Sequence, residues 1–487
     1  MTYRDAVEAL QAQGRFGVRL GLGRTRGLLQ ALGDPGRDLR GALVGGTNGK
    51  GSVQALVGAA LSQAGHLVGQ TPKPHLVSYR ERIVLGGVPI LPDDFARLVS
   101  EVLEAADQVA RRLGPPTEFE LMTAAALTWF ARQGAEVGVI EVGLGGRLDA
   151  TNAWDGGVAA ITNVDRDHME YLGDTLVAIA REKAQIIKRG DRAVTGVSGD
   201  PLEVIRRRAR GVGAPLDVVQ PLPVVAMDRA GLVVRAGELG EIRVGLLGRH
   251  QAANAAVALG VLSALGSAGI ARVEPDHVRA GFAGARWPGR MELLAVGADG
   301  RAHQARTDAP DPSAPDLLLD GAHNAAGARV LAEAVDELRP RLSPGSATLL
   351  LGILRDKEAL AMTAALQGSA TLRDAQVVAT RVPGTPRALA AREVAAAWRE
   401  SWRSTASAAA ARPPTGSSGP ARQAAGSAGP VRDHAALAVE DADDAIALAV
   451  ELGRAANGPI VVAGSLYLVG HARGKLLDDP LLRDPED

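Results

Sequence analysis

A glycine-rich segment with a single lysine, GGTNGKGS at residues 45–52, contains the residue types with the clearest chemical role. Closely spaced glycines let the backbone turn tightly and point its N–H groups at a phosphate. Lys50 can bridge phosphate oxygens, and the hydroxyl of Thr47 or Ser52 can face a metal ion. The common phosphate loop has Ser or Thr directly after the lysine, whereas Gly51 intervenes here. The segment therefore predicts a nucleotide-phosphate site of unusual spacing; the alternative is a plain glycine-rich turn.

Carboxylates and a histidine follow two further apolar runs. Glu141 lies near the end of the run at 137–143, and Asp149 lies in the loop beyond it. Asp165, Asp167 and His168 follow the run at 157–164. Carboxylates at the carboxyl ends of parallel strands face the ligand crevice, and Mg²⁺ prefers such oxygen ligands. The alternatives are a solvated Asp/Gly turn and an ordinary hydrogen-bonded histidine.

Similar polar groups occur later in the chain. Asp320 and His323 lie in LDGAHN, and Asp356 and Lys357 lie in ILRDKE, each after an apolar run. Taken singly, either could be a solvated loop. Lys183 lies in a helical pattern, where a lysine is ordinarily exposed to solvent.

The elements that must position these groups alternate along the chain. Apolar runs at 41–46, 137–143 and 157–164 are separated by helical patterns, which predicts an α/β fold with a doubly wound, mostly parallel sheet around the phosphate loop. The alternation restarts after residue 290. We therefore expect an ATP-binding domain over 1–290 and a smaller, Rossmann-like α/β domain over 291–487. The Ala/Gly/Pro/Ser-rich stretch 404–430 predicts a disordered insert.

Composition excludes several classes of protein. The net charge of -1 over 487 residues favours neither nucleic acid nor an anionic membrane. The absence of cysteine excludes disulfides, thiolate metal sites and a cysteine nucleophile. The N-terminal segment has no long apolar run, so we expect no signal peptide. No segment of the chain has about 20 uninterrupted apolar residues, so we expect no membrane span and hence a cytoplasmic protein.

Six segments match one family in order and spacing: GGTNGKGS, EVGLGGRLDATN, HQAANAAVAL, WPGRME, LDGAHN and GSLYLVG. On these motifs the chain resembles the folylpolyglutamate synthase/dihydrofolate synthase family of the Mur ligase superfamily, from about residue 40 to 475 without the insert. The resemblance implies an ATP-dependent amide ligase. ATP would phosphorylate a carboxylate of dihydropteroate or of a reduced folate, and L-glutamate would attack the acyl phosphate, releasing ADP and phosphate. The implied partners are these small molecules, and a monomer is expected.

The resemblance also implies roles for particular residues. Lys50, Lys183 and His323 would be catalytic, Lys183 as a carbamylated lysine. Mg²⁺, as one or two ions, would be held by Glu141, His168 and Ser52. Nine residues would contact ATP: Thr47, Asn48, Gly49, Lys50, Gly51, Ser52, Asn254, Arg290 and Asp320. The last two would bring ATP toward the second domain. The pterin substrate would contact Thr117, Glu118, Phe119, Glu120, Leu148, Asp149 and Ala150.

One segment departs from the family pattern. The family has Thr-Ser-Pro-His where this chain has PKPH at 72–75, so Lys73 replaces a serine that would contact Mg²⁺. An ammonium cannot ligate a cation. Either Lys73 turns away, or its charge replaces part of the role of the metal. The chain has only six lysines among 54 basic residues, so an incidental lysine is unexpected here.

Two other functions compete with this interpretation. A cell-wall amino-acid ligase of the same superfamily usually has Lys directly before Ser or Thr and a domain before the loop, but about 40 residues precede the loop here. A nucleotide-binding regulator without turnover is favoured by Lys73 alone, and Glu141, His168 and Lys183 oppose it.

Overall fold

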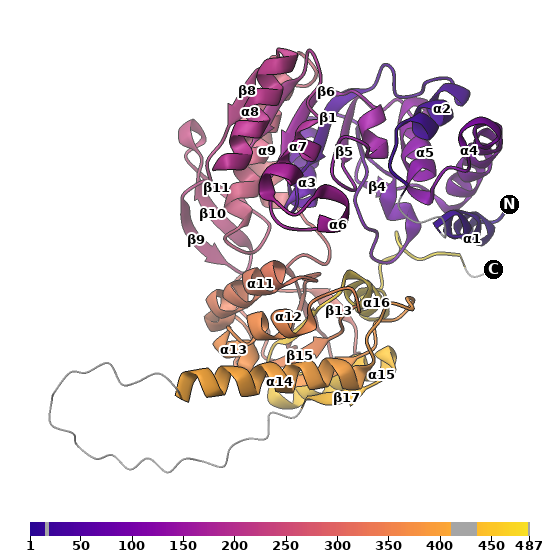
Figure 1. Cartoon of the computed structure of the whole chain (residues 1–487). Coiled ribbons are helices and arrows are strands. Elements are labelled where there is room, and N and C mark those ends of the chain that lie inside the picture. Colours follow the sequence, from indigo (N-terminus) through magenta and orange to yellow (C-terminus); the bar gives the residue numbers. More distant parts are fainter. Residues whose placement is uncertain (15–18, 411–435, 486–487) are drawn as a thin grey trace, which may run out of the picture. The chain divides into compact units, whose positions relative to one another are not determined.

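A computed structural model describes residues 1–14, 19–410 and 436–485 (Figure 1). The chain forms two compact units. The first runs from Met1 to Trp287 and includes the C-terminal segment that starts at Asp479, and the second spans Pro288–Asp478. The chain therefore passes between the units twice.

The first unit is built on an eight-stranded sheet with the strand order β4-β3-β2-β5-β1-β6-β7-β8. Strands β2, β5, β1, β6, β7 and β8 are parallel, and β3 and β4 form an antiparallel edge. The strands are β1 (Arg40–Gly45), β2 (Val68–Gln70), β3 (Val84–Leu85), β4 (Val88–Pro89), β5 (Val137–Glu141), β6 (Gly157–Ile161), β7 (Arg192–Thr195) and β8 (Leu216–Val218). The expected doubly wound, mostly parallel α/β sheet is confirmed.

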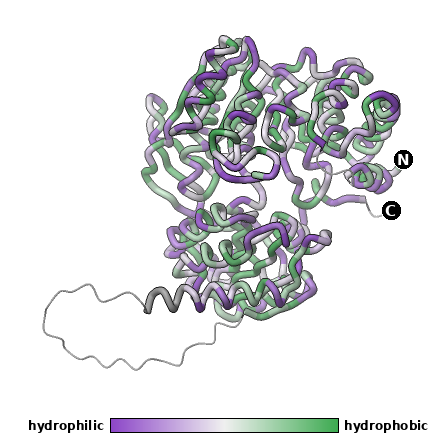
Figure 2. Tube along the Cα trace, in the orientation of Figure 1, coloured by the Kyte–Doolittle hydropathy of each residue, from purple (hydrophilic) through white to green (hydrophobic). Residues whose placement is uncertain are grey.

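Helices cover both faces of this sheet. They are α1 (Tyr3–Gly14), α2 (Gly23–Ala31), α3 (Lys50–Gln63), α4 (Pro92–Leu113), α5 (Glu118–Arg132), α6 (Met169–Leu172), α7 (Leu176–Ala184), α8 (Asp200–Val212), α9 (Gln251–Ser267) and α10 (Pro275–Gly284). Hydrophobic and hydrophilic residues alternate along outer helices such as α4, as Figure 2 shows. A separate antiparallel sheet contains β9 (Val224–Asp228), β10 (Gly231–Arg235) and β11 (Glu241–Val244).

The register of the central strands brings the predicted polar groups to one edge. Val44 pairs with Glu141, and Gly45 pairs with Ile161, so β1, β5 and β6 end together. All five residues of β5 and of β6 are buried, which explains why these strands are uninterrupted apolar runs. The loops that follow these strand ends therefore share one edge of the sheet.

The second unit has a seven-stranded sheet with the order β13-β12-β14-β18-β15-β16-β17. Its strands are β12 (Glu292–Val296), β13 (Ala302–Gln304), β14 (Asp316–Leu319), β15 (Thr348–Leu351), β16 (Gln376–Thr380), β17 (Leu437–Val439) and β18 (Ile460–Ala463). Its helices are α11 (Ala325–Leu338), α12 (Ala359–Leu366), α13 (Ala370–Arg373), α14 (Ala391–Ala410), α15 (Ala442–Ala456) and α16 (Leu466–Leu476). Five of the strands are parallel, and β12 and β13 are antiparallel.

Helix α14 extends into the stretch where the insert is expected. Helix α14 continues to Ala410, so residues 404–410 of the stretch expected to be disordered are helical. Alanine is the strongest helix former, and this part of the stretch is dominated by it. The rest of the predicted insert, 411–430, lies outside the described residues.

Among the helices of the described ranges, none has the length and apolar character that crossing a bilayer requires.

Candidate active site

The phosphate loop connects the end of β1 at Gly45 to the start of α3 at Lys50. Gly49 has a φ of 81°, and a Cβ atom there would lie 2.1 Å from Oδ1 of Asn254. Only glycine therefore fits, and Asn254, expected to contact ATP, lies directly against the loop. Lys50 is the first residue of α3, and its Nζ donates to the carbonyl oxygens of Gly46 and Thr47 at 3.2 and 3.0 Å. Its ammonium thus lies over the loop, at the positive end of the helix dipole.

The additional glycine of the loop has a steric reason. A Cβ atom at Gly51 would lie 2.1 Å from Cζ2 of the Trp287 indole, so any side chain would collide with the ring. Ser52, the next residue, is buried in the first turn of α3. The unusual spacing therefore leaves room for Trp287, which belongs to the WPGRME motif but was not predicted to contact the loop.

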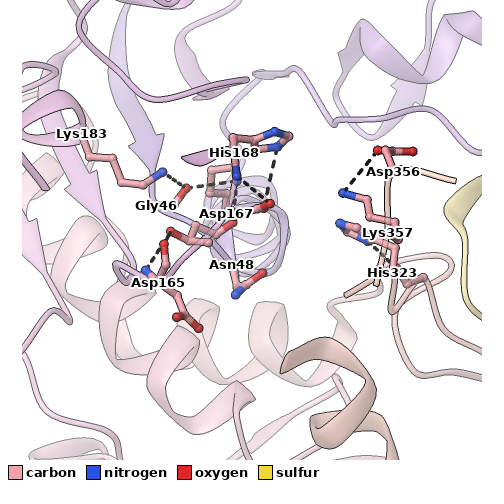
Figure 3. A network of polar contacts seen from close by, with 12 residues as sticks. Gly46, Asn48, Asp165, Asp167, His168, Lys183, His323, Asp356 and Lys357 are labelled. Atoms are coloured by element: carbon pink, nitrogen blue, oxygen red, sulfur yellow. Dashed lines mark hydrogen bonds and ion pairs between the residues drawn. The ribbon is translucent and has the colours of Figure 1, made fainter. Parts of the chain in front are cut away.

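The segment after β6 fixes the loop through hydrogen bonds. The backbone N–H groups of Thr47 and Asn48 donate to Oδ1 of Asn163 at 3.2 and 2.8 Å. The Thr47 hydroxyl donates to the carbonyl of Asp165, and the Asp165 N–H donates back to it, at 3.2 and 3.0 Å (Figure 3). Since the Thr47 hydroxyl is engaged, Ser52 is the better candidate of the two for a metal ligand. Asn163 was missed, although it follows β6 directly.

Glu141 and His168 differ in their surroundings. Glu141 is the buried last residue of β5, and its N–H donates to the Thr71 hydroxyl at 3.1 Å. His168 is exposed, has a φ of 50°, and its Nε2 lies 3.7 Å from Oδ2 of Asp167 (Figure 3). Across the described ranges, no three His, Asp or Glu side chains gather closely enough to hold a metal ion.

The donor set nevertheless fits Mg²⁺ chemically. The Ser52 hydroxyl, the Glu141 carboxylate and the His168 imidazole provide mainly oxygen ligands, and Mg²⁺ keeps several waters when it binds near phosphates. Such an ion therefore needs only one or two protein carboxylates.

Lys183 is buried, in contrast to the solvated surface residue that its helical pattern favoured. It lies on α7, and its Nζ donates to the carbonyl of Gly46 at 2.8 Å (Figure 3). Burial, followed by the charge of Lys50, lowers the pKa of the Lys183 amine to about 7. A large fraction of this amine is therefore neutral near pH 7, which addition of CO₂ requires.

A cavity of about 330 Å³ lies in the first unit. All seven residues expected to bind the pterin substrate line it: Thr117, Glu118, Phe119, Glu120, Leu148, Asp149 and Ala150. The cavity is also lined by residues that the sequence did not identify, namely Gly14, Arg19, Leu20, Arg82, Gly143 and Leu144. The last two follow Glu141 closely in the chain, so the cavity wall continues into the end of β5.

Hydrogen bonds shape the polar part of this wall. Thr117 and Glu120 form a reciprocal capping box at the start of α5, and Glu120 Oε2 also accepts from Nε of Arg24 at 3.0 Å. Asp149 accepts from the backbone N–H groups of Leu144 and Thr151 at 2.7 and 3.0 Å. The Asp149 carboxylate caps this turn, but it is buried and not solvated as the alternative interpretation held, and it also borders the cavity.

In the second unit, Asp320 and His323 follow β14, and Arg290, which precedes β12, lies beside them. Asp320 accepts from the N–H groups of Met291 and Ala322, both at 2.9 Å. Arg290 Nη1 donates to the carbonyl of Gly321 at 3.4 Å, and Nδ1 of His323 lies 2.8 Å from the same oxygen. Burial raises the pKa of Asp320, whereas the charge of Arg290 lowers it. Asp320 therefore ties together the two loops that carry Arg290 and His323.

Asp356 and Lys357 lie in the loop after β15. Nζ of Lys357 is 3.8 Å from Oδ2 of Asp356, which is also 3.6 Å from Nη1 of Arg387 (Figure 3). These partly exposed ion pairs agree with the interpretation of a polar loop.

The strand–loop–helix unit and the two α/β units define the chain as a Mur-type ligase. Residues 44–208 match the model of the Mur ligase middle domain. The dihydrofolate synthase/folylpolyglutamate synthase of Bacillus subtilis is 36% identical over 73% of this chain and 80% of that protein. The protein of the same name from Mycobacterium tuberculosis is 35% identical, over 76% of this chain and 75% of its own.

Solved structures agree with these relatives. The crystal structure of folylpolyglutamate synthase from Thermotoga maritima is 28% identical and covers 97% of both chains with a TM-score of 0.76. Mycobacterium tuberculosis folylpolyglutamate synthase complexed with ADP is 29% identical, covers 99% of this chain and 100% of that chain, and has a TM-score of 0.78. The chain belongs to the folylpolyglutamate synthase/dihydrofolate synthase family, and it is an enzyme of the ligase class. The resemblance to this family is thereby confirmed, and the family is favoured over the two competing functions, a cell-wall amino-acid ligase and a nucleotide-binding regulator.

Proposed function

We propose that this protein uses ATP to join L-glutamate to the carboxylate of dihydropteroate, of reduced folates, or of both. One observation carries the proposal. The cavity lined by the seven expected substrate residues is also lined by Gly143 and Leu144, which follow β5, and β5 pairs with β1, the strand that leads into the phosphate loop. An acceptor in this cavity would therefore have its reacting end near the loop that holds the ATP phosphates.

The cavity suits a flat aromatic acid with polar edges. Its volume of about 330 Å³ lies in the range of small-molecule sites. Phe119, Leu144 and Leu148 offer apolar surface, and Glu118 and Glu120 offer hydrogen-bond acceptors. A ring system with N–H donors, such as a pterin, would match those acceptors.

The reaction needs a leaving group because a carboxylate is a poor electrophile. The acceptor carboxylate attacks the γ-phosphorus, the bond to the β-phosphate oxygen breaks, and ADP leaves. The amine of L-glutamate then attacks the acyl carbon, loses a proton, and displaces inorganic phosphate. Lys50 and the N-terminus of α3 stabilise the phosphate charge, with Asn254 beside the loop. Arg290, Asp320 and His323 are proposed as further contacts of ATP.

Mg²⁺, held by Ser52, Glu141 and His168, would neutralise phosphate charge when bound. We further propose that Lys183 takes up CO₂ as a carbamate, which converts an amine into a carboxylate-like ligand. The support for it is the buried amine with a pKa of about 7 beside the loop.

A product assay tests the function. The enzyme is incubated with ATP, Mg²⁺ and L-glutamate, and with dihydropteroate or tetrahydrofolate in parallel, and the products are measured by mass spectrometry. We expect the mass of one added glutamate, with one ADP per amide bond. ATP binding without a glutamylated product from either acceptor would reject the ligase function and favour a regulator.

A further inference from the structure

Lys73 lies between the substrate cavity and the end of β5. Its Nζ donates to the carbonyl oxygen of Glu141 at 2.6 Å and lies 4.3 Å from the centroid of the Phe119 ring. Phe119 lines the substrate cavity, and Glu141 is the last residue of β5. The ammonium is therefore held by a carbonyl dipole and an aromatic face, both of which stabilise a cation.

The charge of Lys73 has no direct counter-ion. In the described part of the chain, no carboxylate lies within 4.0 Å of its Nζ, although the charges of Asp149 and Glu141 act on it from farther away. An ammonium has three N–H donors, and the Glu141 carbonyl takes one of them.

Two of the acidic groups in the cavity wall, Glu118 and Glu120, are paired with arginines. Arg82 donates to Glu118 at 3.0 Å and to Nδ1 of His75 at 2.8 Å, and Arg24 pairs with Glu120 at 3.0 Å. These acidic groups of the wall are thus compensated within the wall. Lys73, by contrast, keeps donors for an anion that the described residues do not provide.

A second cavity, of about 10 Å³, lies beside the first and is lined by Lys73. It is also lined by Thr71 and Thr151, and it shares Arg82 and Phe119 with the substrate cavity. An acceptor in the larger cavity would come nearest to Lys73 at the wall that Phe119 forms. Under the proposed function, the end of the acceptor at this wall carries the carboxylate.

We propose that Lys73 binds the carboxylate of the acceptor substrate and selects acceptors that carry this negative charge. The proposal rests on the proposed function. A charge-assisted hydrogen bond in a partly buried site is stronger than a neutral one. An analogue without the negative charge should therefore bind more weakly at this site. Lys73 is then a specificity-determining residue that contacts the substrate.

The test compares two ligands in equilibrium binding. Dihydropteroate and the same molecule with its carboxylate replaced by a carboxamide are titrated by calorimetry, with EDTA and without ATP. The wild-type protein should bind the carboxylate at least about tenfold more tightly, the effect of one hydrogen bond to a charged group. In Lys73→Met this preference should fall to within about twofold, because the stem remains and the charge is lost.

Lys188→Met is the matched control. Lys188 is also a half-buried lysine whose Nζ donates to a backbone carbonyl, that of Trp154 at 2.6 Å, but it lines neither cavity. It should keep the wild-type preference. If calorimetric melting shows that Lys73→Met is unfolded, Lys73→Gln and Lys73→Arg replace it; the former should lose the preference and the latter should retain it.

The proposal is overturned if the folded Met or Gln variant still prefers the carboxylate as the wild type does, or if the wild type has no preference. Failure of the proposed function is a separate result, which the product assay detects. In that case the wild-type enzyme makes no glutamylated product.

Discussion

The Lys183 amine and the Gly46 carbonyl meet across 137 residues of sequence, with Nζ donating to the oxygen at 2.8 Å. Lys50 donates to the same oxygen at 3.2 Å. Two lysines therefore share one acceptor at the start of the phosphate loop. Their mutual repulsion adds to the burial of Lys183, and both effects favour a neutral amine there.

This relationship predicts that Lys183 forms a carbamate. With ¹³C-labelled bicarbonate, NMR should show a carbamate resonance that is absent in Lys183→Met. At a fixed partial pressure of CO₂, the resonance should grow as the pH rises through about 7, because that pKa marks where the neutral amine becomes the majority form. Identical spectra for the two proteins would exclude the modification.

The same proposal makes a prediction for catalysis. Lys183→Ala should reduce the rate of glutamate ligation by about 10²-fold or more if a ligand is lost at the phosphates. Acetate or formate should restore part of the rate, since a small carboxylate can occupy the vacated position. Turnover that does not respond to any short acid would argue against a carboxylate at this place.

Lys50→Ala should abolish ligation and leave the fold intact. The ammonium lies over the loop, and the loss of one fixed transition-state donor typically costs about 10²–10³-fold in rate. Turnover and thermal melting are measured together. Lys475→Ala is the control, because Lys475 is an exposed partner of Asp443 in the second unit, and it should behave like the wild type. Near-normal turnover of Lys50→Ala would reject the phosphate-loop assignment.

Gly51→Ala should lower both the melting temperature and ATP affinity. Its Cβ atom would lie 2.1 Å from the Trp287 ring, so the loop or the indole must shift. Combining it with Trp287→Leu should recover part of the ATP affinity, as expected for two residues in direct contact. Gly211→Ala on α8, where nothing lies within 4 Å, should leave both quantities unchanged or raise stability slightly. Additive effects of the Gly51 and Trp287 changes would show that the collision does not explain the glycine.

Asp320→Ala should weaken nucleotide binding and destabilise the second unit. It removes the acceptor of the Met291 and Ala322 N–H groups, and each buried donor left unpaired costs about 1–3 kcal/mol. The dissociation constant of ADP is measured by titration calorimetry, and unfolding by denaturant. An unchanged dissociation constant would mean that Asp320 has a purely structural role in its own loop.

The positions of strand ends were the most predictable part of the site. Glu141 and Asp320 follow runs whose uninterrupted apolar character reflects burial on both faces of a parallel sheet. The resemblance supplied the seven cavity residues, which no periodicity could have assembled from 117–120 and 148–150.

Contacts made over long sequence separation were not predictable. The pattern around Lys183 could not show a partner in the phosphate loop, Gly46, and a surface lysine was the ordinary expectation. Trp287 and Gly51, which lie against each other, are also far apart in sequence. The antiparallel sheet of β9, β10 and β11 was also not predicted, because its short strands lack a strong apolar run.

The central claim, that the acceptor carboxylate is activated as an acyl phosphate, is tested most directly by oxygen transfer. Dihydropteroate labelled with ¹⁸O in its carboxylate is incubated with the enzyme, ATP, Mg²⁺ and L-glutamate, and the released phosphate is analysed by mass spectrometry. We predict one ¹⁸O atom in inorganic phosphate for each amide bond formed. Amide formation with unlabelled phosphate would contradict the account.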